Sequence, residues 1–321
     1  MTLSTEHTAW FTDAFAAMAD NIEHAVLGKR RVVELVLAAA LSEGHVLLED
    51  VPGTGKTALA RAISQTVQGT STRIQFTPDL LPGDVTGITV YDQKHGEFQF
   101  HAGPVFANVV LADEINRASP KTQAALLEVM EEGNVTVDGV TRSVGHPFLV
   151  VATQNPVELA GTYRLPEAQL DRFMIRTSIG YPDDASTMRI LQGAADPRRR
   201  VTGIVDTATV MRMSELTRDV HVNPAIHDYV VRLVNATRAA AEVRLGVSVR
   251  GALSLARLVL TWALAHGRDY VTPDDVRDLV EPAFAHRILL HPEAEFDGVT
   301  ATQVLAEILL GVPAPTENGR V

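Results

Sequence analysis

Cysteine is absent from the 321-residue sequence. A disulfide scaffold, an iron–sulfur cluster and a thiolate zinc site are therefore excluded. The eleven histidines are scattered, and none stands at a metal-ligand spacing with carboxylates, so we expect buried or surface histidines. The chemistry of this protein must come from other side chains.

The sequence also lacks a secretory signal and a long apolar run. Its first residues, MTLSTEHTAWFTDAF, contain no basic start followed by an apolar stretch. The longest apolar stretches, such as residues 32–41, have about half the length that a membrane span needs. We expect a soluble cytoplasmic protein without membrane insertion.

Basic residues are outnumbered, with 28 Lys and Arg against 39 Asp and Glu and a net charge of −11. Bulk nucleic-acid binding needs a basic surface, so this balance argues against it, while a local basic pore stays compatible with it. The hydrophobic share of 46% and the charged share of 21% are ordinary for a globular protein. The length suits one large domain and a smaller one.

Apolar strands alternate with helices in the first part of the chain. Helices are expected over residues 8–19, 31–42 and 56–67. The expected strands are HVLLED (45–50), RIQF (73–76), ANVVLADE (107–114), FLVVATQN (148–155) and FMIRTSIGY (173–181). Runs this apolar indicate strands that are buried on both faces, as in a parallel sheet covered by helices.

Two hairpins interrupt this alternation. ITVYD and EFQFH flank QKHG within residues 88–101, with period-two patterning. TV and VT flank Asp138-Gly139, which is a strong two-residue hairpin signal. Hairpins inserted into an α/β core are expected to serve surface or partner contacts.

Only helices are expected over residues 185–291. One of them is predicted over residues 224–243, and Thr272-Pro273-Asp274-Asp275 opens another. We therefore expect an α/β domain over residues 1–184 and a helical domain over 185–293. Residues 294–321 would add a helix, which more commonly docks on its own domain than on a partner, and a frayed tail rich in Pro and Gly.

The segment DVPGTGKTALA (50–60) is a phosphate-loop motif between a strand and a helix. Gly53 and Gly55 let the backbone wrap a phosphate, and the helix N-terminus adds its positive dipole end. Lys56 would reach the β- and γ-phosphates, and Thr57 would offer its hydroxyl to Mg²⁺. The motif departs from its usual form at the first position, where Asp50 replaces glycine.

Acidic and amide side chains follow two later strands. VVLADE places Asp113 and Glu114 at a strand's carboxyl end, where ligands sit in open α/β sheets. Asp113 would hold Mg²⁺, and Glu114 would orient the attacking water. Asn155 could sense the γ-phosphate. The plain alternatives are a solvated acidic strand end and a turn-forming Asn-Pro.

Several long blocks resemble the MoxR family of AAA+ ATPases: GHVLLEDVPGTGKT, FTPDLLPGDVTG, LADEINRASPKTQAALLEVMEEG, ATQNPVE and LPEAQLDRF. The resemblance covers roughly residues 25–290. It implies an α/β P-loop NTPase (AAA+) fold, with a parallel five-stranded sheet, inserted hairpins and an all-α lid domain. It also implies a ring, usually a hexamer, with ATP or ADP and Mg²⁺ between neighbouring subunits.

The resemblance also implies roles for individual residues. Asp113 and Glu114 become the Walker B pair, and Asn155 becomes sensor 1. Arg172 in QLDRF resembles an arginine finger that reaches the next subunit's nucleotide, and Arg250 resembles the sensor-2 arginine. The remaining expected nucleotide contacts are Val26, Leu27 and Gly28 on the adenine, and Pro52, Gly53, Thr54, Gly55, Lys56, Thr57 and Ala58 in the Walker A loop.

The two arginine roles have alternatives. Arg172 follows Asp171, and such a neighbour pair is often only a surface ion pair. Arg117 in EINRAS is a further candidate for a contact across the interface. The sequence leaves open whether Arg172 or Arg117 is the main arginine acting in trans.

The function implied by the resemblance is an ATP-driven remodeller of a protein client. Enzyme maturation or cofactor insertion, with a partner carrying a von Willebrand factor A domain, is the expected setting. Phe98 and Phe100 in the first hairpin would be client contacts or strand-packing aromatics. The alternatives are a DNA- or RNA-remodelling motor, which the acidic balance disfavours, and a slow nucleotide-gated scaffold.

Overall fold

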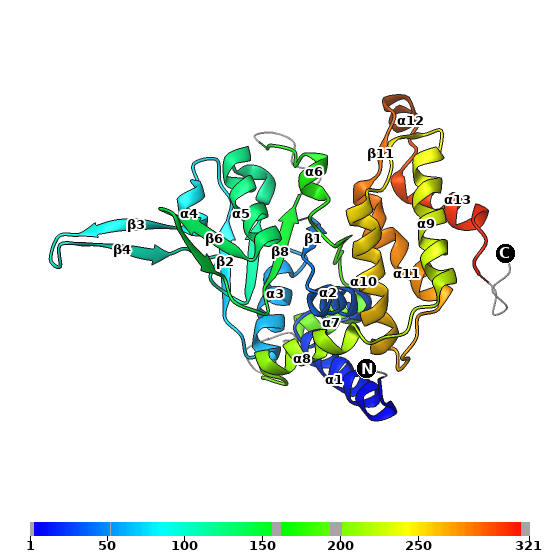
Figure 1. The fold of residues 1–321 in the computed structure, drawn as a ribbon, viewed down its shortest axis with the longest axis horizontal. Helices are drawn as coiled ribbons and strands as arrows, with labels where there is room; N and C mark the ends of the chain where they lie inside the picture. Colours follow the sequence, from blue (N-terminus) through cyan, green and yellow to red (C-terminus); the bar gives the residue numbers. More distant parts are fainter. Residues whose placement is uncertain (1–2, 52, 156–161, 193–200, 316–321) are drawn as a thin grey trace.

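The computed structural model describes residues 3–51, 53–155, 162–192 and 201–315. An α/β part and a helical part lie side by side, and a long hairpin projects away from both (Figure 1). Within the described residues, no helix combines the length and the apolar composition needed to cross a bilayer.

The α/β part is built on a five-stranded sheet with the order β2-β5-β8-β1-β9. Every neighbouring pair in it is parallel. Its strands are β1 (Val46–Glu49), β2 (Ser71–Gln75), β5 (Val109–Asp113), β8 (Leu149–Gln154) and β9 (Ile175–Thr177). The expected parallel five-stranded sheet is confirmed, although β9 is much shorter than the apolar run over residues 173–181.

Helices cover both faces of this sheet, and β1 shows how the two faces differ. Val46 and Leu48 face a hydrophobic core that the sheet shares with the helical part. Leu47 faces a second hydrophobic core, on the other side of the sheet, which includes Leu126 of α5 (Pro120–Glu132). The helices and short turns of this part are α1 (Thr5–Glu23), α2 (Arg30–Leu41), α3 (Lys56–Thr66), α4 (Pro82–Thr86), η1 (Ile115–Arg117), α5 (Pro120–Glu132) and α6 (Glu167–Leu170). Burial on both faces explains why the strands read as continuous apolar runs.

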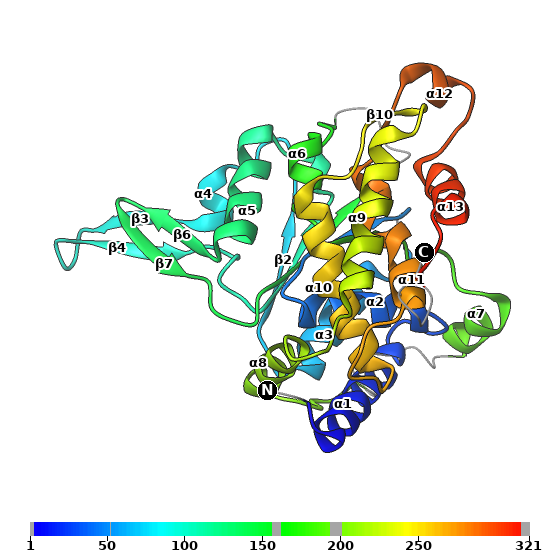
Figure 2. The ribbon, with the colours of Figure 1, turned by 45° about the vertical axis from the view of Figure 1, so that its right-hand side comes forward.

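Both expected hairpins are present and lie next to each other (Figure 2). They are β3 (Gly87–Asp92) with β4 (Glu97–Ala102), and β6 (Asn134–Val137) with β7 (Val140–Ser143). Phe98 is 75% exposed on the outer half of the first hairpin. Phe100 instead packs 5.7 Å from the Phe106 ring and beneath the Arg142 guanidinium.

The helical part contains α7 (Asp184–Leu191), α8 (Thr207–Thr217), α9 (Pro224–Ala239), α10 (Val249–Ala265), α11 (Pro273–Phe284), η3 (Ala285–Arg287), α12 (Pro292–Phe296) and α13 (Ala301–Gly311). The helix expected to open at Thr272 is present, and a capping box starts it: the Thr272 hydroxyl accepts from the Asp275 amide, and the Asp275 carboxylate accepts from the Thr272 amide. The last helix, α13, packs on α9 and α11, as expected for docking on its own domain.

The expectation of helices alone over residues 185–291 was wrong. β10 (Val243–Leu245) and β11 (Leu289–Leu290) form a two-stranded antiparallel sheet. The helix predicted over residues 224–243 stops at Ala239, because Ala240 turns to an extended conformation with ψ 134°. Gly246 follows β10 and passes so close to Arg238 that a Cβ would lie 2.8 Å from its backbone nitrogen.

Candidate nucleotide-binding site

The phosphate loop connects β1 to α3 and ends in a left-handed turn. Gly53 and Gly55 have φ values of 85° and 100°, a region that glycine enters without steric cost. Gly55 caps α3, so the free amides of the first helical turn lie beside the loop. This arrangement favours an anion at the helix N-terminus. Pro52, another expected contact, lies outside the described residues.

Lys56 lies folded into this loop. Its Nζ donates to the backbone oxygens of Asp50 at 3.2 Å and Val51 at 3.1 Å. The Thr54 hydroxyl donates to the same Val51 oxygen at 3.4 Å. The ammonium therefore occupies the centre of the loop, where it can exchange these carbonyl oxygens for phosphate oxygens.

Asp113 ends β5 with its carboxylate held on both sides. One oxygen accepts from the Thr153 hydroxyl at 2.7 Å, and the other accepts from the Arg73 guanidinium at 2.6 Å. The Asp113 side chain is only 11% exposed. Its orientation is thus fixed before any ligand arrives, since neighbouring strands provide both partners.

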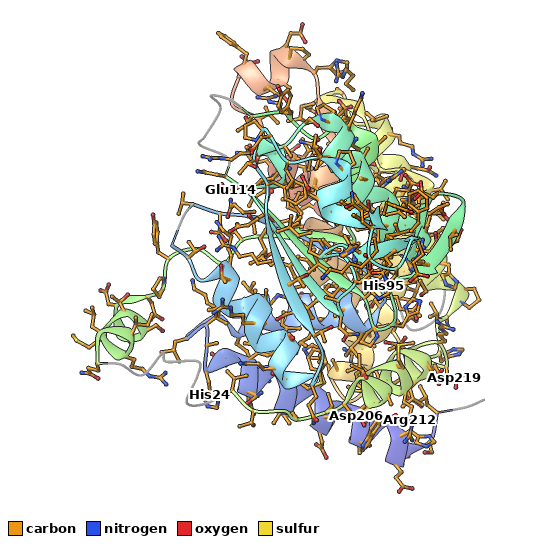
Figure 3. All side chains as sticks on the ribbon, turned by 90° about the vertical axis from the view of Figure 1, so that its left-hand side faces the viewer. His24, His95, Glu114, Asp206, Arg212 and Asp219 are labelled. Carbon is orange, nitrogen blue, oxygen red and sulfur yellow. The ribbon has the colours of Figure 1, made fainter. Side chains whose placement is uncertain are left out.

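Glu114, labelled in Figure 3, follows in a left-handed backbone conformation with φ 57° and ψ 49°. This conformation costs a non-glycine residue about 1 kcal/mol. The Glu114 amide donates to the Thr153 hydroxyl at 2.9 Å. Its carboxylate accepts from Gln75 at 2.8 Å and pairs with Arg117 at 3.2 Å. The strained turn therefore directs the Glu114 side chain along the edge of the sheet.

These segments enclose one cavity of about 520 Å³. It is lined by Gly53, Gly55, Lys56, Thr57, Ala58, Arg73, Gln75, Asp113 and Glu114. Lys56 and Thr57 from the loop thus meet Asp113, which ends β5, and Glu114, which follows it, as the sequence predicts. Hydroxyl and carboxylate oxygens are ligands that Mg²⁺ accepts, so Thr57 and Asp113 fit a shared ion. Mg²⁺ sites commonly use few protein ligands together with phosphates, and no cluster of three metal-type side chains occurs among the described residues.

The segment expected to contact adenine lies against this loop. Val26 and Leu27 are buried, and Val26 Cγ1 would lie 3.5 Å from a Cβ on Gly55. Gly28 has φ 73° and faces Ser186 at the start of α7, where a Cβ would lie 2.5 Å from the hydroxyl. Val26 thus lies beside the loop, and none of the three residues lines the cavity.

Asp50 accounts for the departure from the usual motif. It is buried, and its two carboxylate oxygens accept the amides of Ile179 at 2.5 Å and Gly180 at 3.0 Å. Glycine at this position would leave both amides without these bonds. Asp50 therefore ties the phosphate loop to the segment that runs from β9 towards α7.

Asn155 follows β8 directly and lies between the two halves of the site. β8 pairs with both β1 and β5, and the Asp50 amide donates to the Gln154 oxygen at 3.1 Å. Asn155 is half-buried and is not part of the cavity lining. Its place at the carboxyl end of the strands is the one that its expected role requires.

The two candidate arginines meet elsewhere, at the carboxylate of Glu131 near the end of α5. Arg172 pairs with one Glu131 oxygen at 3.0 Å, and Arg250 pairs with the other. This place lies at the amino-terminal edge of the sheet. Met130, next to Glu131, has its backbone oxygen 3.0 Å from the ring of His45, and His45 directly precedes β1. Parallel strands about five residues long separate the two edges by about 15 Å.

Within this chain Arg250, expected to contact the nucleotide, pairs with Glu131 instead of lining the cavity around the phosphate loop. The start of α10 is docked at the opposite edge instead. The Ser248 hydroxyl donates to the Asp171 carboxylate at 2.8 Å, and the buried Arg287 guanidinium donates to the same carboxylate at 2.7 Å. Neither Arg172 nor Arg250 lines the 520 Å³ cavity.

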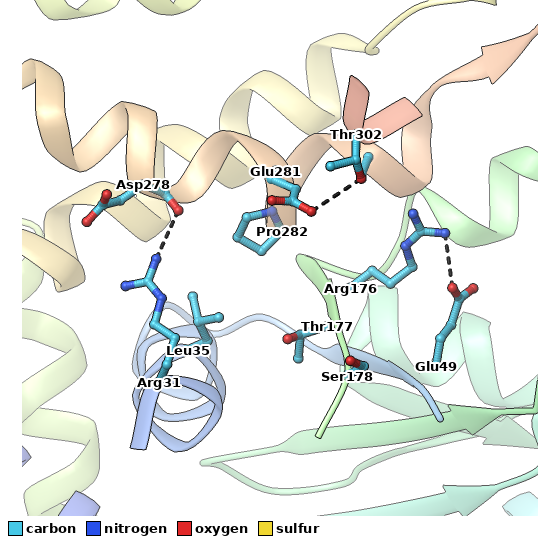
Figure 4. Close-up of a pocket in the computed structure, with 11 residues that line it drawn as sticks. Arg31, Leu35, Glu49, Arg176, Thr177, Ser178, Asp278, Glu281, Pro282 and Thr302 are labelled. Atoms are coloured by element: carbon cyan, nitrogen blue, oxygen red, sulfur yellow. Dashed lines mark hydrogen bonds and ion pairs between the residues drawn. The ribbon is translucent and has the colours of Figure 1, made fainter. Parts of the chain in front are cut away.

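A second cavity of about 360 Å³ lies between the sheet and the helical part (Figure 4). Glu49 pairs with Arg176 there at 3.2 Å, and Arg31 donates to the Asp278 oxygen at 3.0 Å. Glu281 there also accepts from the Thr302 hydroxyl at 3.2 Å, and the phosphate loop does not line this cavity. The cavity around Lys56, which the phosphate loop lines, is therefore the candidate nucleotide site.

Comparison with known proteins agrees with this geometry. The family described as ATPase family associated with various cellular activities (AAA) matches residues 45–175, and an AAA lid domain matches residues 235–308. Uncharacterized protein YeaC of Bacillus subtilis is 46% identical over 94% of this chain and 95% of its own. Chaperone MoxR1 of Mycobacterium tuberculosis is 41% identical, over 93% of this chain and 81% of its own. Protein MoxR of Methylorubrum extorquens is 33% identical, over 96% and 97%. The chain belongs to the MoxR family of AAA+ ATPases.

A solved structure supports the same fold for this MoxR-family chain. A protein of Cytophaga hutchinsonii, named as a candidate ATPase, superimposes with a TM-score of 0.90 at 36% identity. The match covers 97% of this chain and 98% of the other. The α/β P-loop fold with a helical lid is thereby confirmed.

Three residues at this candidate site were not predicted from the sequence: Arg73 and Gln75, which line the cavity, and Thr153, which bonds Asp113. Gln75 ends β2, so its place at the carboxyl end of a strand could have indicated it, as it did for Asp113. Arg73 and Thr153 lie inside strands, and only the neighbouring strand shows what each one bonds. No local pattern signals those contacts.

Proposed function

We propose that this protein binds ATP with Mg²⁺ and hydrolyses it to ADP and phosphate. The observation that carries the proposal is the single cavity that joins Lys56 and Thr57 to Asp113 and Glu114. A point cation, a hydroxyl, a metal-binding carboxylate and a second carboxylate are the groups that phosphoryl transfer to water requires.

Each residue has a definite part in that reaction. Lys56 neutralises charge on the β- and γ-phosphates, and Thr57 and Asp113 hold the ion. Mg²⁺, when bound, supplies further charge neutralisation at the phosphate oxygens. Glu114 accepts a hydrogen bond from the water that attacks the γ-phosphorus, and Asn155 positions that water.

Gln75 and Arg117 hold the Glu114 carboxylate within the chain. We assign Gln75 the task of keeping Glu114 in place until ATP is bound. Arg117 is already engaged with Glu114 of its own chain, which favours Arg172 over Arg117 as the main arginine acting in trans.

The arrangement of the two edges supports assembly into a ring, and a hexamer is the proposed form. The phosphate loop opens at the carboxyl edge of the sheet, while Arg172 and Arg250 lie at the amino edge. Because about 15 Å of strand separates the two edges, these arginines are placed to serve a nucleotide held by the next copy rather than one in their own chain. Hydrolysis would then depend on assembly.

A protein client is the proposed substrate of the mechanical work. The relative from Mycobacterium tuberculosis carries the name chaperone, and its likeness to this chain supports the same task here. The β3–β4 hairpin offers Tyr91 and Phe98, whose rings pack at 5.1 Å and are 51% and 75% exposed. A partner with a von Willebrand factor A domain, and a role in enzyme maturation or cofactor insertion, complete the proposal.

The deciding experiment is steady-state ATPase activity across a range of protein concentrations. Wild type should gain specific activity as the concentration rises, because assembly supplies the arginine. Lys56→Ala and Glu114→Gln should lose it at every concentration. Arg172→Ala should lose it while still binding a fluorescent ATP analogue.

Lys121→Ala is the matched control, since Lys121 is exposed in the first turn of α5 and away from the cavity. Its activity should equal that of wild type. If wild type is as inactive as Glu114→Gln at every concentration and still binds ATP, the hydrolase is ruled out in favour of a nucleotide-gated scaffold.

A further inference from the structure

The carboxylate of Glu131 is shared by two arginines that come from different parts of the fold. Arg172 precedes β9, and Arg250 lies in the first turn of α10 in the helical part. Each guanidinium bonds a different oxygen of Glu131. We propose that Glu131 is a positioning residue that holds Arg172 and Arg250 as a pair for the phosphates of a nucleotide bound by a neighbouring copy. This inference rests on the proposed function.

The backbones that carry the two arginines are locked together, but their side-chain tips are not. Arg287, whose side chain is only 2% exposed, donates to the backbone oxygens of Asp171 at 3.1 Å and Phe173 at 2.7 Å. Ser248, which caps α10, donates to the Asp171 carboxylate. These bonds fix the backbone positions of Arg172 and Arg250. The direction of their guanidinium groups is set by the ion pairs with Glu131.

Charge explains why a carboxylate is needed. Two guanidinium groups that converge on one place repel each other, and an acid between them removes that repulsion. The three side chains together still carry one net positive charge. The pair is therefore held in a fixed arrangement and keeps its attraction for a phosphate, which a neutral contact could not achieve.

The exposure of the three side chains suits a contact across an interface. Arg172 is 27% exposed, Arg250 is 43% exposed and Glu131 is 35% exposed. The buried Nε of Arg172 has no hydrogen-bond partner within the described chain, so this guanidinium is incompletely bonded in the isolated copy. An ordinary surface ion pair joins one acid to one base. Here one acid pairs with two arginines from different parts of the fold, and one of them keeps a donor without a partner among the described residues.

Subunit mixing tests this role directly. Lys56→Ala removes the phosphate site but leaves the arginines, whereas Arg172→Ala removes the arginine but leaves the phosphate site. Each variant alone should be inactive, and a mixture should recover activity at interfaces where a Lys56→Ala copy offers Arg172 to an Arg172→Ala copy. Glu131→Gln is then added to one partner or to the other.

Glu131→Gln on the Lys56→Ala copy should lower the recovered kcat about tenfold or more, with KM for ATP unchanged, because supporting contacts of this kind typically contribute tenfold or more. The same change on the Arg172→Ala copy should leave the recovery intact. Glu132→Gln is the matched control, since it removes the neighbouring charge at the same helix end, and neither arginine is paired with Glu132 in the described structure.

The outcomes distinguish a failure of the proposed role of Glu131 from a failure of the proposed ATPase activity. Full recovery with Glu131→Gln on the arginine-donating copy overturns the role of Glu131 and leaves the ATPase intact. A rise in KM without a fall in kcat also overturns it, because that result indicates a general structural role. A wild type without hydrolysis overturns the proposed function, and the role of Glu131 falls with it.

Discussion

Asp50 joins two segments that lie far apart in the sequence. Its buried carboxylate accepts the backbone amides of Ile179 and Gly180, on the path from the sheet to α7. Buried donors that lose a charged acceptor cost about 1–3 kcal/mol each. The phosphate loop is thus held to that path, and a change of loop geometry on nucleotide binding would act directly on it.

Replacing Asp50 with alanine should therefore lower the free energy of unfolding by about 2–3 kcal/mol. Urea unfolding monitored by circular dichroism measures this change. Asp13→Ala, at an exposed position of α1, is the control and should stay within about 0.5 kcal/mol of wild type. Equal midpoints for the two variants would show that the amide bonds of Asp50 contribute little.

Thr153 supports both acids of the site with one hydroxyl. It donates to the Asp113 carboxylate and accepts the Glu114 amide, from a fully buried position on β8. Thr153→Val keeps the shape and removes both bonds. We expect about a tenfold loss of ATPase activity or of apparent affinity for Mg²⁺, the lower range for outer contacts of a metal ligand.

A titration of ATPase activity with Mg²⁺ measures the effect of Thr153→Val. Thr136→Val makes the same chemical change at an exposed position of β6 and should behave as wild type. Both variants should keep the far-ultraviolet spectrum of the wild type. An unchanged Mg²⁺ dependence for Thr153→Val would mean that Asp113 is oriented by Arg73 alone.

At the scale of elements, the sequence predicts what is contiguous along the chain. The strands β1, β5 and β8 are apolar because both faces are buried, and the loop before α3 contains its own glycines and lysine. β10 and β11 could not be predicted in this way, because they are three and two residues long and pair residues as far apart in the sequence as Val243 and Leu290. Strands that short leave no periodic pattern to detect.

The same distinction applies to the site. Lys56, Thr57, Asp113 and Glu114 stand in local motifs, so the sequence predicts them. Glu131 and Arg287 are different, because their partners come from other elements. A glutamate at the end of an amphipathic helix reads as solvated, and no pattern marks an arginine that will be buried. The place of Arg250 at the far edge likewise follows only from how α10 docks.

His45 connects three elements and gives the molecule a pH dependence. One ring nitrogen contacts the Met130 oxygen of α5, and the other accepts the Val150 amide of β8. Burial lowers the pKa of His45 from 6.5 to about 4, helped by the nearby positive charge of Arg257, although the contact with Met130 opposes the shift. The native state therefore keeps this imidazole neutral at a pH where the unfolded chain binds a proton.

Stability from His45 is fully present above pH 6.5 and is lost as the pH falls towards 4, because the unfolded state takes up the proton first. The full loss would amount to about 3 kcal/mol. Unfolding should be measured between pH 4 and pH 7 for wild type, for His45→Gln and for the exposed control His24→Gln. The difference between wild type and His45→Gln should shrink as the pH falls. A constant difference would contradict the lowered pKa.

At the scale of the whole molecule, the proposed function requires the two edges of the sheet to carry complementary halves of one site. The carboxyl edge presents Lys56 and the acids, and the amino edge presents Arg172 and Arg250 on Glu131. Bound ATP would place phosphates where the arginines of a neighbouring copy can bond them. A ligand that binds the assembled form better than the single copy shifts the equilibrium towards assembly.

Assembly should therefore depend on nucleotide. Glu114→Gln is expected to bind ATP without hydrolysing it, and in sedimentation velocity it should form a larger species with Mg²⁺ and ATP than without them. Adding Arg172→Ala and Arg250→Ala should raise the concentration for half-assembly about tenfold or more, since each lost phosphate bond to a charged group contributes over 1.4 kcal/mol. Arg218→Ala, which removes a surface pair with Glu43, is the control and should leave assembly unchanged. Identical sedimentation with and without ATP at every concentration would show that bound ATP does not join neighbouring copies, and would contradict a site shared between them.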